Sequence, residues 1–117
     1  MKNWTIRDIA MWQDDTFAPC VRSQNEKCKL EAREYLKAKG KNKKREYADW
    51  VITKCLLAYF KKEPDAMLVL ETVMSLPEWS EIQELINKKM EINTKRKWIK
   101  THTGEWRHVS EETTSNV

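Results

Sequence analysis

The chain contains few of the residues that break helices or cross-link small secreted folds. Its 117 residues include two glycines, three prolines and three cysteines. So little glycine and proline leaves few positions for the tight turns of a β-rich domain. Cys20, Cys28 and Cys55 are odd in number and form no Cys-x-x-Cys pair, which argues against a disulfide framework and against a zinc site. We therefore expect three reduced thiols.

The sequence also lacks a long apolar run. No stretch of about 18 apolar residues is present that could cross a bilayer. The N-terminus does not show the basic and then apolar pattern of a signal peptide. We expect a cytoplasmic protein with no membrane partner.

Charged side chains, in contrast, are abundant. They make up 34% of the residues, and the net charge is +4. High charge with little glycine and proline favours amphipathic helices, so we predict an all-α fold. A chain of this length can bury one hydrophobic core but not two. We expect one domain over residues 1–109, followed by a disordered tail at residues 110–117.

Helix signals divide the chain into four to five helices. Thr5 with Asp8, and Ser23 with Glu26, have the spacing of capping boxes that start the first two helices. Gly40 is expected to end the second helix in a left-handed conformation. The remaining helices are expected from Asn42 to Phe60, from Pro64 to Val73 and from Trp79 to about Trp98. From Tyr47 to Phe60 the third helix is apolar almost all round, so it should be the most buried.

Two pairs of acidic residues flank Gly40. Glu31 and Glu34 precede it, Glu46 and Asp49 follow it, and each pair spans one helical turn. Glu34 and Glu46 both lie six residues from Gly40, while Glu31 and Asp49 both lie nine residues from it. If residues 24–60 form an antiparallel helical hairpin, the two pairs face each other at matching heights.

Four clustered carboxylates require a positive partner, because their repulsion grows where water is excluded. Carboxylates without histidine or thiolate favour Mg²⁺, with Mn²⁺ as a substitute. Acids at this spacing also occur on ordinary solvated helix faces. Asp49, however, lies between Ala48 and Trp50 in a helix with hardly any other polar face. We therefore predict a metal site formed by the four acids, which are Glu31, Glu34, Glu46 and Asp49.

A second group of polar residues lies near the C-terminus. Lys89, Asn93 and Arg96 stand at positions i, i+4 and i+7, so one helix face presents an ammonium, an amide and a guanidinium. This face suits a triphosphate, although a basic helix end can also be merely solvated. Trp12, Phe17 and Trp98 either stack on a base or pack in the core. His102 and His108 are isolated and receive no role.

At these residues the sequence resembles the MazG-like all-α nucleoside triphosphate pyrophosphohydrolases. Their signature is an E-x-x-E helix followed, a short loop later, by an E-x-x-D helix. Within that group it is most similar to the phage and bacterial dATP/dGTP pyrophosphohydrolase-like proteins. The resemblance is carried by Glu31 to Glu34 with Glu46 to Asp49, by Lys89 to Trp98, and by Trp12-Gln13 with Thr16-Phe17.

The resemblance implies a bundle of four to five helices with a central helical hairpin that carries the metal site. It implies Mg²⁺-dependent hydrolysis of a nucleoside triphosphate, here a purine deoxynucleotide, to the monophosphate and pyrophosphate. Glu31, Glu34, Glu46 and Asp49 would be the catalytic and metal-binding residues. The implied substrate contacts are Lys89, Asn93, Arg96, Trp12, Gln13 and Trp98. A homodimer or a larger homo-oligomer is also implied.

Two other functions are compatible with the residues. A basic helical protein could bind nucleic acid through its lysine clusters. A protein-interaction module could carry the acids only as surface charge. We favour the enzyme over both, and a nucleic-acid partner is not expected, because only the enzyme explains acids within an apolar helix.

Overall fold

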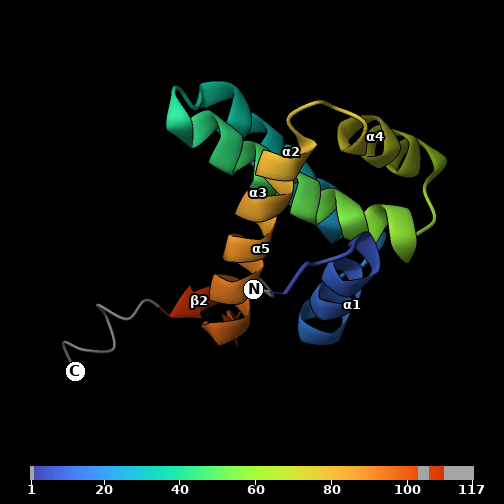
Figure 1. Cartoon of the computed structure of the whole chain (residues 1–117). Helices are drawn as coiled ribbons and strands as arrows, with labels where there is room; N and C mark the ends of the chain where they lie inside the picture. The colour runs from blue at the N-terminus through green and yellow to red at the C-terminus, as the bar shows by residue number, and fades with distance from the viewer. Residues whose placement is uncertain (1, 103–105, 110–117) are drawn as a thin grey trace.

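A computed structural model describes residues 2–102 and 106–109 of the chain. Within these residues it contains the following elements: α1 (Ile6–Phe17), α2 (Val21–Lys37), α3 (Lys41–Tyr59), α4 (Pro64–Met74), α5 (Trp79–Lys95), β1 (Lys97–Lys100) and β2 (Trp106–Val109). The expectation of a mainly helical fold is confirmed (Figure 1). The tail expected at residues 110–117 lies outside the described residues.

Helix α3 runs through the middle of the molecule (Figure 1). Helices α1, α2, α4 and α5 all pack against it. Its buried residues are Ala48, Val51, Ile52, Thr53, Cys55, Leu56, Leu57 and Ala58. They face several directions around the helix, as is typical of a helix enclosed by others. The prediction that the third helix is the most buried is confirmed. No helix in the described part of the chain is both long and apolar enough to span a bilayer.

The start of α2 differs from the predicted one. The helix begins at Val21, and Cys20 is its N-cap, with the Sγ atom accepting a hydrogen bond from the Ser23 backbone N–H at 3.4 Å. The predicted capping box of Ser23 and Glu26 is wrong. Ser23 Oγ instead donates to the Cys20 carbonyl oxygen at 3.0 Å, within the first turn. The predicted box of Thr5 and Asp8 at the start of α1 is confirmed.

Gly40 has a positive φ angle, but it does not form the predicted left-handed end of α2, because its ψ angle is −138°. Its φ angle is +62°, and it is the N-cap of α3. Helix α2 has already ended at Lys37, with Ala38 as the C-cap. Asn42 therefore lies inside α3 rather than capping it. The early end of α2 leaves a connection of only three residues, 38–40, which returns α3 along α2 as a helical hairpin.

The C-terminal part departs most from the all-α prediction. Helix α5 ends at Lys95, because Arg96 has extended backbone angles of −73° and 147°. Strands β1 and β2 then pair antiparallel, with Trp98 opposite His108 and Lys100 opposite Trp106. Aromatic and β-branched side chains at residues 98, 99, 106 and 109 favour strands. The predicted end of this helix at about Trp98 is therefore wrong. Lysines occur both in the last turn of α5 and in β1, so composition does not mark the boundary between them.

Two buried glutamines join α1 and α2 to α3. Gln13 Nε2 donates to the Ile52 carbonyl at 2.7 Å, and Gln24 Nε2 donates to the Thr53 carbonyl at 2.9 Å. Gln24 Nε2 also donates to Gln13 Oε1 at 3.2 Å. A buried polar group without a partner costs about 1–3 kcal/mol. These bonds therefore favour one rotation of α1 and α2 about α3, and so orient the side chains of the turn of α3 that includes Asp49.

The central position of α3 predicts unequal effects for two leucines. Leu57→Ala is expected to lower the free energy of unfolding by about 2–5 kcal/mol, because Leu57 is fully buried and its removal leaves a cavity. Leu68→Ala on α4 is the matched control, since Leu68 is 63% exposed. Urea unfolding followed by circular dichroism measures both. Equal losses in the two variants would contradict this core.

Candidate active site

Three of the four predicted acids meet between α2 and α3. One carboxylate oxygen from each of Glu31, Glu46 and Asp49 lies within 4.8 Å of the others. All three side chains are half-buried. Glu34 is exposed and lies outside this group, although it is only one turn from Glu31. The helical hairpin thus brings together three acids as a compact cluster, which we call the acidic cluster.

The electrostatics of the acidic cluster are unfavourable for charged carboxylates. Burial is the main reason that the pKa of Glu31 is raised to about 6, and repulsion from Asp49 follows. Glu46 and Glu34 add further repulsion, while Lys27 acts in the opposite direction. The pKa of Asp49 is also raised, because loss of water outweighs its attraction to nearby cations. A cluster of this kind favours the binding of a proton or a cation.

Several cations lie around Asp49. Lys89 Nζ is 3.1 Å from Asp49 Oδ2, in an ion pair whose side chains are 26% and 30% exposed. Arg96 and Lys27 also lie close enough to act on the pKa of Asp49. Arg96 itself donates from NH1 to Asn93 Oδ1 at 3.4 Å. Of the predicted phosphate-binding residues, Lys89 therefore forms an ion pair with the acidic cluster, while Asn93 and Arg96 are joined by a side-chain hydrogen bond.

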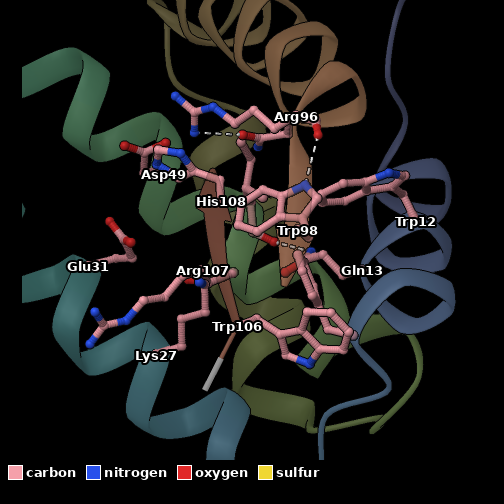
Figure 2. A pocket seen from close by; sticks show the side chains of 14 residues that line it. Trp12, Gln13, Lys27, Glu31, Asp49, Arg96, Trp98, Trp106, Arg107 and His108 are labelled. Atoms are coloured by element: carbon pink, nitrogen blue, oxygen red, sulfur yellow. Dashed lines mark hydrogen bonds between the residues drawn. The ribbon is translucent and has the colours of Figure 1, made fainter. Parts of the chain in front are cut away.

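A pocket of about 450 Å³ extends from the acidic cluster to a group of aromatic rings. Its lining residues are Trp12, Gln13, Phe17, Lys27, Glu31, Asp49, Ile52, Thr53, Asn93, Arg96, Trp98, Trp106, Arg107 and His108. Figure 2 shows Glu31 and Asp49 on one side of the pocket and Trp12 on the other, with His108 between them. The pocket thus has an acidic end and an aromatic end.

The aromatic end is organised around Trp98. Its ring centroid lies 4.9 Å from that of Phe17 and 6.2 Å from that of Trp12, in edge-on arrangements. Its Nε1 donates to the Asn93 carbonyl oxygen at 3.0 Å, near the end of α5. The rings of Trp12, Phe17 and Trp98 therefore pack against one another and also line the pocket. Stacking on a base stays a prediction.

Gln13 lines the same pocket, but its amide is already engaged. Nε2 donates to the carbonyl oxygens of Ile9 and Ile52, and Oε1 accepts from Gln24. Only one lone pair of Oε1 remains for another partner. Gln13 thus contributes more to the joining of three helices than to hydrogen bonding within the pocket.

Five polar or aromatic residues line the pocket without having been predicted to do so, namely Lys27, Thr53, Trp106, Arg107 and His108. Lys27 lies four residues before Glu31 on α2, a spacing at which oppositely charged side chains meet, and this signal was available. Trp106, Arg107 and His108 come from β2. They reach the pocket because β2 pairs with β1. A helix predicted to continue to about Trp98 leaves no room for this hairpin.

A comparison of the chain with protein-family models finds no match. No match is found among curated proteins. The same comparison with solved structures also finds none. The function must therefore be inferred from the geometry of the pocket itself.

The raised pKa of Glu31 predicts a pH-dependent stability. Because the folded-state pKa of about 6 exceeds the usual 4.5, folding favours the protonated acid, and stability is lost as pH rises through this window. Glu31→Gln is therefore expected to stabilise the protein in EDTA at pH 7.5, on the order of 1 kcal/mol after screening. At pH 4.5 the gain should be smaller. Urea unfolding at the two pH values measures the difference.

The control for this experiment is Glu71→Gln, which removes a charge from an exposed position on α4. It should change stability little at either pH. A loss of stability in Glu31→Gln at pH 7.5, or the same effect in both variants, would contradict the electrostatics described for the acidic cluster.

A metal titration tests the cluster in a second way. Mg²⁺ or Mn²⁺ is expected to raise the melting temperature of the protein, because a ligand that binds only the folded state stabilises it. The effect should disappear in Asp49→Asn and persist in Glu71→Gln. Differential scanning fluorimetry with and without EDTA measures it, and an equal response in both variants would argue against metal binding at the cluster.

Proposed function

We propose that this chain hydrolyses a nucleoside triphosphate, a purine deoxynucleotide in particular, to the nucleoside monophosphate and pyrophosphate with the help of Mg²⁺. The observation that carries this proposal is the composition of one pocket. Carboxylates, cations and aromatic rings line it together, with Glu31 and Asp49 on one side and Trp12 on the other (Figure 2). These groups suit the metal, the phosphates and the base of a nucleotide. The large indole rings offer more stacking area to a purine than to a pyrimidine.

The acidic cluster fits a divalent cation. Its three oxygens lie within 4.8 Å of one another, and it contains neither histidine nor cysteine. Such oxygen donors suit Mg²⁺ and Mn²⁺. Glu31, Glu46 and Asp49 would hold the ion, and we keep Glu34 as a more exposed fourth acid. When bound, the ion would supply positive charge for phosphate oxygens and lower the pKa of water.

In this proposal, Lys27 of α2, Lys89 of α5 and Arg96 at the end of α5 hold the phosphates. Lys89 lies on the acidic cluster and Arg96 on the pocket wall, so the two can approach a phosphate chain from different directions. Lys27 lies on the α2 side of the same pocket. Fixed positive groups of this kind position the chain and offset the charge that develops on the leaving pyrophosphate.

The reaction also needs a group that takes a proton from the attacking water. The water oxygen attacks the α-phosphorus, the bond from that phosphorus to the bridging oxygen breaks, and pyrophosphate leaves. We assign this role to one of the glutamates of the site, because a carboxylate beside the attacking water can act as a general base.

We extend the proposal to a homodimer or larger homo-oligomer. Helix α4 and the turn before it expose Leu68, Met74 and Phe60. Exposed apolar side chains of this kind can pack against another chain.

A second function is favoured by the lysines at the turn between α2 and α3. Lys37, Lys39, Lys41 and Lys44 are all exposed. A basic turn of this kind can bind a nucleic-acid backbone. We rank this function second, because it leaves the half-buried acids without a role.

The proposed reaction predicts metal-dependent release of monophosphate and pyrophosphate from a panel of nucleoside triphosphates. Glu31→Gln and Asp49→Asn are each expected to lower kcat/KM by at least about 100-fold, because each removes a charge on which the chemistry depends. Glu34→Gln, at the exposed acid, is expected to lose less. Chromatography of the products in Mg²⁺, Mn²⁺ or EDTA measures all three.

The matched control is Glu71→Gln, which should keep wild-type turnover. Full activity in both Glu31→Gln and Asp49→Asn would refute the proposed site. Absence of turnover with every nucleotide, together with salt-sensitive binding of nucleic acid in EDTA, would favour the second function instead.

A further inference from the structure

Two residues of strand β2 line the pocket, with Trp106 at its aromatic end and His108 between the two ends (Figure 2). The register places His108 opposite Trp98 and Trp106 opposite Lys100. Paired residues and residues two apart share a face of a sheet, so these four side chains lie on one face of the hairpin. That face meets α1, since Phe17 contacts the rings of both Trp98 and Trp106.

Trp98 is held firmly in this arrangement. Its indole N–H is bonded to the Asn93 carbonyl, and its ring contacts Trp12, Phe17 and His108. A ring with its only donor satisfied and three aromatic neighbours has little freedom to adapt to a ligand. Trp98 therefore anchors the hairpin to α5 and α1.

Trp106 and His108 are less constrained. Trp106 is half-buried, its ring centroid lies 5.5 Å from that of Phe17, and Lys100 Nζ lies 5.9 Å from it. His108 is exposed, and its ring lies 5.6 Å from that of Trp98. Over residues 2–102 and 106–109, no hydrogen bond is made by the indole nitrogen of Trp106 or by the ring nitrogens of His108. Both side chains thus keep polar atoms available at the pocket.

We propose that Trp106 and His108 form the wall that binds the nucleobase, so that the C-terminal hairpin determines which base is accepted. This inference rests on the proposed function, because it assumes that the phosphates lie at the acidic end. Trp106 offers a ring for stacking, which tolerates any base. Its N–H can only donate, while His108 can donate or accept, so the two nitrogens can distinguish base edges.

Removal of the Trp106 ring is expected to weaken nucleotide binding more than chemistry. In Trp106→Ala the KM for the best nucleotide should rise about 5- to 150-fold, the range given by the loss of one stacked base, with kcat little changed. Trp106→Phe keeps an aromatic ring and should recover most of the loss. Steady-state kinetics with each nucleoside triphosphate measures both variants.

Inorganic tripolyphosphate separates the two ends of the pocket, because it has phosphates but no base. Its inhibition constant against the nucleotide should be the same in the wild-type protein and in Trp106→Ala, which also shows that the variant is folded. Ile99→Ala is the matched hairpin control, since Ile99 is 52% exposed and does not line the pocket. It should change neither constant.

His108→Ala tests the choice of base directly. The ratio of kcat/KM between two nucleotides that differ only in the base should change at least several-fold, while tripolyphosphate inhibition stays the same. This variant also carries the test if Trp106→Ala does not fold.

The outcomes distinguish the two proposals. If the wild-type protein turns over nucleotides but the KM and the base ratio are unchanged in these variants, the hairpin wall is refuted and the proposed function stands. An equal change in nucleotide KM and tripolyphosphate inhibition would also refute the wall, because the effect would not belong to the base. If the wild-type protein turns over no nucleotide, both proposals fail.

Discussion

The enclosure of α3 by the other helices is the constraint on which the rest of the structure depends. Four helices pack against α3, and none of its residues from Glu46 to Tyr59 is exposed, so a polar side chain in this part of the helix loses water. Asp49 is the acid in this position, and burial raises its pKa despite the ion pair with Lys89. A half-buried acid on a central helix destabilises a fold unless it is compensated. The charged residues near Asp49 are Glu31, Glu46, Lys27, Lys89 and Arg96.

That compensation explains why the pocket contains opposite charges side by side. Glu31 and Glu46 bring further negative charge to Asp49, while Lys27, Lys89 and Arg96 approach from α2 and α5. Three carboxylates share one small volume, and burial with mutual repulsion raises the pKa of Glu31 to about 6 despite the nearby cations. Carboxylates grouped and perturbed in this way are the basis of the cation site that we propose.

The aromatic end of the pocket depends on a different interaction. Trp98 follows the last turn of α5 and donates to the Asn93 carbonyl, which also accepts from the Arg96 backbone N–H at the helix end. Its ring then packs on Phe17 and Trp12 of α1. The same contacts that end α5 therefore place the hairpin beside α1 and close the pocket with Trp106 and His108 (Figure 2). The acidic end is built by helix packing and the aromatic end by ring packing.

The sequence by itself determined the features that depend on neighbouring residues. Helical periodicity and capping patterns predicted α1, the burial of α3, the start of α4 at Pro64 and the spacing of the acids about Gly40, because each depends on residues within a few turns. Only the tertiary structure decided which acids meet and which side chains complete the pocket. The packing of α2 on α3 groups Glu31 with Glu46 and Asp49 while Glu34 stays in solvent. The hairpin brings Trp106 to Phe17, 89 residues away in the chain. Such contacts depend on the relative rotation of helices and on strand register, which are set by long-range packing and leave no periodic signal in the sequence.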